Sequence, residues 1–135
     1  TEGVKILIKR SKTDQSGEGS IKAIPYFDNQ EFCPVVALKN YIEEKFSNIN
    51  EGKVFDISDK SVALIIKRYA EKAGLDSSKY AGHSLRSGFA TTAAEFGAEE
   101  RNIMAMTGHK TTQMVRRYIQ EANLFKNNAL NKIKI

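Results

Sequence analysis

Apolar and polar residues alternate near the start of the chain, which is the pattern of a β-strand. The segment VKILIKR (residues 4–10) begins with this alternation, and SIKAIPYF (residues 20–27) predicts a second strand, which Asp28 and Asn29 end. The stretch between them is polar, contains glycine and favours a turn. We therefore expect an antiparallel β-hairpin with an exposed loop that carries Lys12.

The apolar period becomes helical after Cys33. Pro34 suits the first position of a helix, whose apolar face consists of Val35, Leu38, Tyr41 and Ile42. A second helix is expected after Ser58 or Asp59, either of which can cap it, and Gly74 is expected to end it. Its apolar face consists of Val62, Ile65, Ile66, Tyr69 and Ala73.

Further helices are expected in the second half of the chain. The segment GHSLRSGFATTAAEFG (residues 82–97) predicts a helix with one buried face, formed by Leu85, Phe89, Ala93 and Phe96. Residues 99–107 predict another helix, which Gly108 ends, and Thr111 or Thr112 is expected to cap a last one through QMVRRYIQEA (residues 113–122). The patterns together predict a mainly α fold with a small antiparallel β-hairpin near the N-terminus, an α+β domain.

The basic residues gather in the C-terminal third of the chain. Over 135 residues the net charge is +5, and the 41% of hydrophobic residues can form a core without a metal or a disulfide. From residue 101 onward Glu121 is the only acidic residue, beside the basic residues Arg101, Lys110, Arg116, Arg117, Lys126, Lys132 and Lys134. This distribution indicates either a face that binds nucleic-acid phosphates or a solvated helical surface.

The cysteine content and the apolar runs of the sequence indicate where in the cell the protein is found. Cys33 is the only cysteine, which rules out an internal disulfide and fits a reducing cytosol. No apolar run is long enough to span a membrane and no signal peptide opens the chain, so we expect a cytoplasmic protein without a membrane partner. Because the first residue is Thr1 and not Met, we expect a piece of a longer protein.

Three side chains stand at positions that suit phosphate binding. His83 and Arg86 are three residues apart on an expected helix, so they share one face near its N-terminus, where free N–H groups attract anions. The same positions also suit a capping histidine and a surface arginine. His109 follows Gly108 at a helix end, where it either donates a hydrogen bond to a substrate oxygen or has a structural role.

Tyr118 has two interpretations. It falls on the apolar stripe Met114, Val115, Tyr118, Ile119 and Ala122, so periodicity alone places it in the core. In the other interpretation its hydroxyl attacks a phosphate. Hydrophobic spacing gives no reason to prefer the second.

The order of these motifs resembles the tyrosine recombinase (phage integrase) family. HSLR (residues 83–86) and TGHKTTQMVRRY (residues 107–118) are similar to the family signature of H-x-x-R, then a Gly-His pair, then the nucleophilic tyrosine. The segment RSKTDQ (residues 10–15) is similar to the hairpin turn that bears the family's catalytic lysine, which corresponds to Lys12. The resemblance covers nearly the whole chain, from the hairpin through the tyrosine helix.

The resemblance implies an enzyme that breaks and rejoins DNA in site-specific recombination or integration. Tyr118 would attack a phosphodiester and form a 3′-phosphotyrosyl bond, with His83 as base and phosphate ligand. Arg86 would bind two non-bridging oxygens at once, which a lysine cannot do. His109 would hydrogen-bond the same phosphate, and Lys12 would protonate the departing 5′ oxygen as general acid.

The resemblance also implies partners. We expect no cofactor and no metal, and double-stranded DNA contacted by Lys110, Arg116 and Arg117. We expect a homo-oligomer, a tetramer on DNA, held through a C-terminal tail whose apolar residues are Leu124, Phe125, Leu130 and Ile133. In the cell we expect a bacterial or phage-encoded protein at the nucleoid.

One departure from the family concerns a second arginine. The family's site has another arginine ahead of the hairpin, and this chain begins after that position; Arg10 does not match the motif. Removing one preorganised charge donor costs about 3 kcal/mol, or roughly 10²–10³ in rate. We therefore expect residues 1–135 to be a C-terminal catalytic domain, truncated at its N-terminal side, that is weak or inactive alone. The alternatives are a non-catalytic DNA-binding module, in which Tyr118 only packs, and a type IB topoisomerase-like enzyme.

Overall fold

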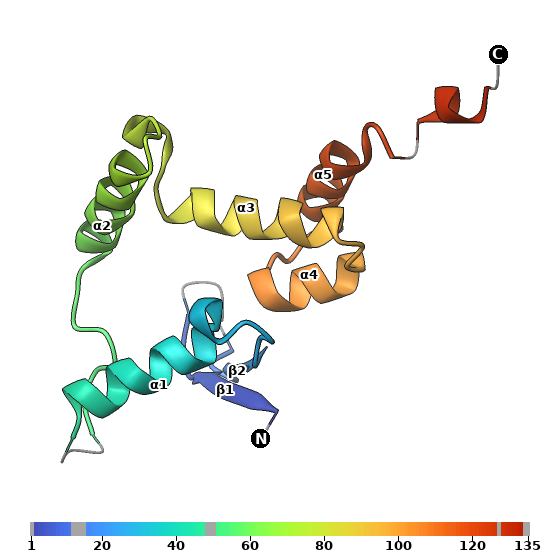
Figure 1. The fold of residues 1–135 in the computed structure, drawn as a ribbon. Coiled ribbons are helices and arrows are strands. Elements are labelled where there is room, and N and C mark those ends of the chain that lie inside the picture. The colour runs from blue at the N-terminus through green and yellow to red at the C-terminus, as the bar shows by residue number, and fades with distance from the viewer. Residues whose placement is uncertain (1, 12–15, 48–50, 127, 134–135) are drawn as a thin grey trace. The chain divides into compact units, whose positions relative to one another are not determined.

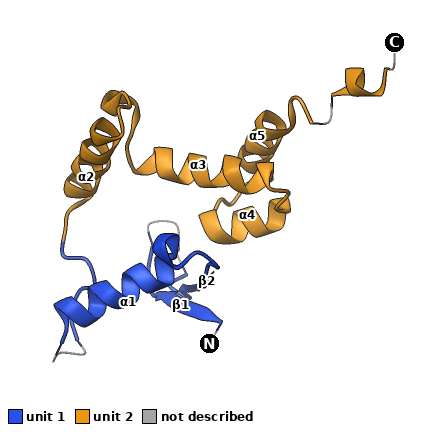
Figure 2. Ribbon diagram, in the orientation of Figure 1, with its two compact units in different colours: residues 1–56 blue, residues 57–135 orange. Residues whose placement is uncertain are grey.

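A computed structural model of the chain describes residues 2–11, 16–47, 51–126 and 128–133 (Figure 1). The chain forms two compact units, residues 1–56 and residues 57–135, which Figure 2 shows in separate colours. The first unit contains an antiparallel β-hairpin and a helix, and the second unit is helical. The expected mainly α fold with a small antiparallel β element near the N-terminus is confirmed.

The first unit begins with strands β1 (Gly3–Ile8) and β2 (Ser20–Pro25), which pair antiparallel with Leu7 opposite Ile21. A 3₁₀ turn, η1 (Gln30–Phe32), then leads into α1 (Pro34–Lys45), which begins with proline as expected. Cys33 is buried between these elements, and its Sγ accepts a hydrogen bond from the N–H of Phe27 at 3.3 Å. The thiol therefore packs at the junction of hairpin and helix.

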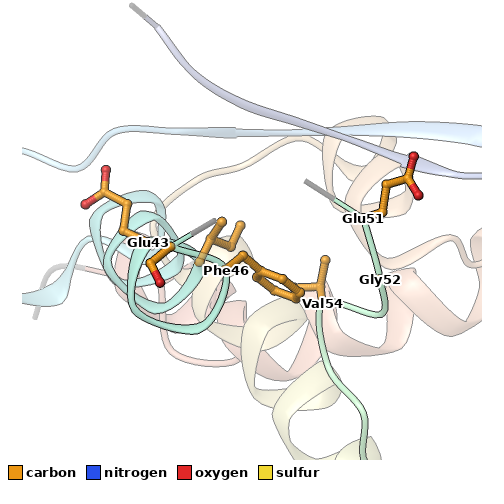
Figure 3. A pocket seen from close by; sticks show the side chains of 7 residues that line it. Glu43, Phe46, Glu51, Gly52 and Val54 are labelled. Carbon is orange, nitrogen blue, oxygen red and sulfur yellow. The ribbon is translucent and has the colours of Figure 1, made fainter. Parts of the chain in front are cut away.

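A cavity of about 570 Å³ lies beside the C-terminal end of α1 (Figure 3). Glu43 and Phe46 of the α1 region line it on one side, and the segment from Glu51 to Val54 lines it on the other. Lys45 holds this segment, because its ammonium donates to the carbonyl oxygen of Val54 at 2.9 Å. Among the described residues, none of the side chains predicted to carry chemistry lines this cavity.

The second unit consists of helices joined by short turns, in the order α2 (Asp59–Lys72), η2 (Ser77–Lys79), α3 (Gly82–Glu95), α4 (Glu100–Thr107), α5 (Thr112–Asn123) and η3 (Ala129–Lys132). Ser58 caps α2 as expected, since its hydroxyl accepts a hydrogen bond from the N–H of Ser61 at 3.1 Å. Gly74 follows the end of α2 with a φ of 74°, also as expected. In the described part of the chain, no helix is long and apolar enough to cross a lipid bilayer.

The core of the second unit forms where α3, α4 and α5 meet (Figure 1). Its buried members are Ala90 and Ala94 of α3, Ile103 of α4 and Val115 of α5. Partly buried side chains pack around them: Ala93, Met104, Tyr118, Ile119 and Ala122. The three helices that contain the predicted histidines, arginine and tyrosine, or end next to them, thus share one core.

The predicted buried face of α3 is wrong for its three large residues, although its fourth member, Ala93, packs against the buried cluster. Leu85, Phe89 and Phe96 are exposed, and the buried positions are Ala90 and Ala94, whose exposures are 0% and 5%. The physical reason is helix packing distance, which depends on the size of the side chains at the contact. Two alanines four residues apart let α5 and α4 approach the backbone of α3 closely, whereas the larger residues lie on other faces.

Gly108 forms the turn between α4 and α5. Its φ of 71° and ψ of 19° lie in the left-handed region, where a β-carbon costs about 1–2 kcal/mol. Its N–H donates to the carbonyl oxygen of Met104 at 2.8 Å and ends α4. The expected helix end at Gly108 is confirmed, and the turn places His109 directly after α4.

Candidate functional site

His83 and Arg86 are the second and fifth residues of α3, near its N-terminus. The start of this helix is fixed by Ser84, whose Oγ accepts from the N–H of Ala81 at 3.0 Å and donates to the carbonyl oxygen of Lys79 at 3.1 Å. His83 and Arg86 are both exposed, and with α2 they line one cavity of about 400 Å³. A site open to solvent and lined by an imidazole and a guanidinium can bind an anion.

Tyr118 of α5 reaches α3 with its hydroxyl. Its Oη lies 3.1 Å from the Oγ of Ser87, the residue after Arg86, and both side chains are half-buried. The Tyr118 ring meanwhile packs against the buried cluster of the second unit. The two interpretations of Tyr118 therefore do not exclude each other, because its ring packs while its oxygen lies beside the helix that carries Arg86.

His109 lies next to Tyr118. Its ring is half-buried, and the centres of the two rings are 6.2 Å apart at an interplanar angle of 44°. Nδ1 of His109 is 2.7 Å from Oγ1 of Thr107, the last residue of α4. Burial lowers the pKa of the His109 imidazole, and the positive charge of Arg86 lowers this pKa further. Arg86 thus acts on His109 as well as lining the cavity with His83.

Three pairwise observations connect four of the predicted residues within the second unit. Arg86 shares a cavity with His83 and affects the charge of His109, and His109 neighbours Tyr118. Lys12 lies outside the described residues, so its role remains a prediction. Hydrophobic spacing gave no signal for Ser87 or Thr107, although Ser87 lies four residues after His83 and so falls on the same side of the helix.

Two of the residues predicted to contact DNA, Arg116 and Arg117, lie on α5, and the third, Lys110, lies just before it. Arg116 pairs with Glu100 of α4 at 3.1 Å, and Arg117 pairs with Glu121 at 3.6 Å. Lys110 is exposed. Exposed ion pairs of this kind contribute about 0–1 kcal/mol, so a DNA phosphate can compete for either arginine.

Comparison with known proteins shows the family. The sequence of residues 31–124 matches the model of the phage integrase family. The chain belongs to this family of tyrosine recombinases. In the tyrosine recombinase chain, His83, Arg86, His109 and Tyr118 all fall within the matched residues, whereas Lys12 precedes them.

The chain is similar in sequence to two named recombinases. Over 144 aligned residues the chain is 45% identical to an integrase/recombinase xerD homolog of Selenomonas ruminantium, covering 98% of this chain and 42% of the relative. Over 73 residues it is 33% identical to the tyrosine recombinase XerC of Syntrophus aciditrophicus (strain SB), covering 54% of this chain and 22% of the relative. The chain thus spans less than half the length of either relative. No solved structure matches it.

Proposed function

We propose that the chain is the C-terminal catalytic domain of a tyrosine recombinase, which carries out site-specific DNA recombination through a 3′-phosphotyrosyl intermediate. The observation that carries this proposal is the position of the Tyr118 oxygen. It lies 3.1 Å from Ser87, the residue after Arg86, while the ring of His109 lies 6.2 Å from that of Tyr118. These contacts support a site in which a phenol, a guanidinium and two imidazoles act on one phosphodiester.

The chemistry explains why the tyrosine needs these neighbours. A phenol has a pKa near 10, so only about one in a thousand is ionised at neutral pH. Attack on phosphorus therefore requires a proton acceptor, which we assign to His83, and cations that stabilise the developing charge. Arg86 supplies that charge with its planar fork on two non-bridging oxygens. His109 hydrogen-bonds the same phosphate.

The proposed step balances without a cofactor. The Tyr118 oxygen forms a bond to phosphorus and the bond from phosphorus to the 5′ oxygen breaks. The phenolic proton goes to His83, and Lys12 protonates the departing 5′ oxygen. Since a phosphodiester is replaced by a phosphotyrosyl ester, a 5′ hydroxyl from another strand can reverse the step and rejoin the DNA.

We further propose how the chain meets its partners. Lys110, Arg116 and Arg117 contact the phosphates of double-stranded DNA in the cytoplasm. Four copies assemble on DNA through the apolar side chains of the tail. Two observations support this use of the tail, since Phe125 is 87% exposed and Leu130 is 69% exposed.

A nicked suicide DNA substrate tests the proposal. Because the chain spans 42% of the xerD homolog, the full-length protein is used. We expect a covalent protein–DNA adduct with the unmodified protein and none with Tyr118→Phe, whose ring still packs. No adduct from either protein, with salt-sensitive binding intact, would identify a non-catalytic DNA-binding module instead. The packing of the Tyr118 ring is compatible with that second function as well.

Arg86→Lys separates catalysis from docking. We expect this variant to lose nearly all cleavage while its affinity for duplex DNA stays within a few-fold, because a lysine keeps the charge but not the planar fork. A collapse of affinity, measured by fluorescence anisotropy with labelled duplex, would make Arg86 a docking residue.

A further inference from the structure

The hydroxyl of Thr107 has two short polar contacts. Its Oγ1 lies 3.0 Å from the carbonyl oxygen of Ile103 and 2.7 Å from Nδ1 of His109. The backbone N–H of His109 approaches the same Oγ1 at 3.5 Å. Each hydrogen bond needs one proton. Which atom donates it follows from the protons that a hydroxyl, a carbonyl and an imidazole can carry.

The hydroxyl proton belongs to the contact with Ile103. A carbonyl oxygen carries no proton, so two oxygens at 3.0 Å form a hydrogen bond only if the Thr107 hydroxyl donates. A hydroxyl has one proton and two lone pairs. With its proton given to Ile103, Oγ1 can only accept, and the His109 backbone N–H uses one of its lone pairs.

Nδ1 of His109 must therefore bring its own proton to Oγ1. A neutral imidazole has a single ring proton, so the tautomer with a proton on Nδ1 has a bare lone pair on Nε2. The opposite tautomer would require the Thr107 proton for Nδ1. It would leave the oxygens of Thr107 and Ile103 at 3.0 Å with no proton between them.

We infer that Thr107 is a positioning residue that holds His109 as its Nδ1–H tautomer and so presents Nε2 as the unprotonated ring atom of the site. This inference rests on the proposed function for its role in the reaction. A phosphodiester oxygen accepts only from a protonated nitrogen. Nε2 thus takes a proton from solvent when the anionic phosphate binds, since a nearby negative charge favours the imidazolium. Nδ1–H stays bonded to Thr107 throughout.

The tautomer is read directly by long-range ¹H–¹⁵N NMR of the 135-residue chain labelled in histidine, with the two histidines assigned by His83→Asn. At a pH where His109 is neutral, we expect Nδ1 to show the protonated shift and Nε2 the unprotonated one. Thr107→Val should move the proton to Nε2, and Thr107→Ser, which keeps the hydroxyl, should not. A wild-type His109 protonated on Nε2, or a tautomer that Thr107→Val leaves unchanged, would overturn the inference.

Adduct formation by the full-length protein gives the second readout. We expect Thr107→Val to slow it about fivefold, as one lost hydrogen bond allows, and Thr107→Ser to restore the rate. An unchanged rate in Thr107→Val would refute the role of Thr107 in positioning His109 for the reaction. Failure of the proposed function is distinguishable from this, because the wild-type protein would then form no adduct while its NMR spectrum still reports the tautomer.

Discussion

The hydrogen bond between Ser87 and Tyr118 connects the two helices on which the candidate site depends, and its free energy can be isolated. The hydroxyls are 3.1 Å apart and half-buried, so the bond should contribute about 0.5–1.5 kcal/mol to the free energy of unfolding. Ser87→Ala and Tyr118→Phe should each destabilise the chain by about 1 kcal/mol. The double variant should cost little more than either single one, because both remove the same bond.

Urea unfolding of the wild-type chain, the two single variants and the double variant gives the coupling free energy. Thr92→Ala provides a matched control, since Thr92 is an exposed hydroxyl on the same helix, and its effect should simply add to that of Tyr118→Phe. In the full-length protein, Ser87→Ala should also slow adduct formation about fivefold, because the Tyr118 oxygen is then less restrained. A coupling indistinguishable from zero would refute the hydrogen bond, and an unchanged rate would refute its role in positioning.

Other expectations concern the core, the turn and the titration of the site. Ile103→Ala should lower the free energy of unfolding by about 2–5 kcal/mol, measured with urea, because Ile103 is 1% exposed; a loss below about 1 kcal/mol would contradict its place in the core. Gly108→Ala should cost about 1–2 kcal/mol at a φ of 71°, and an unchanged urea midpoint would mean that another backbone conformation is populated. An NMR titration should place the pKa of His109 below its ordinary value of 6.5, and Arg86→Gln should raise this pKa. In the wild-type protein, His109 binds a proton more readily in the unfolded chain than in the folded one. This histidine should therefore lower the free energy of unfolding as the pH falls through the range just below 6.5. A pKa that does not respond to Arg86→Gln would contradict the proximity of the two groups.

Local signals in the sequence predicted most of the helix and strand ends. Ser58 and Gly74 act on backbone groups within a few residues of themselves, so their roles follow from residue type alone. The alternation in residues 4–10 likewise predicts a strand whatever the rest of the chain does. These features were predictable because each depends on short-range geometry.

The buried face of α3 was not predictable in the same way. Leu85 and Phe89 are more hydrophobic than Ala90 and Ala94, and spacing alone therefore favours the wrong face. Which face is buried depends on how closely α4 and α5 can approach, and small side chains allow the closest contact. The role of Ser87 was missed for a related reason, whereas the contacts of Thr107 are local and hydrophobic spacing does not report them because they are polar. Ser87 bonds a residue 31 positions away, and no local period reports such a contact.

The buried position of Val115 has a consequence for the timing of the proposed reaction. Val115 is 0% exposed and lies three residues before Tyr118, so α5 cannot withdraw without exposing a whole valine side chain. That exposure costs about 1.5–3 kcal/mol, which limits the withdrawn state to roughly 0.6–7 molecules in a hundred. Most molecules of a chain that is not on DNA therefore keep Tyr118, the proposed nucleophile, in one place. If Tyr118 cleaves DNA as proposed, the delay before cleavage should reflect the binding of DNA rather than a search among tyrosine conformations.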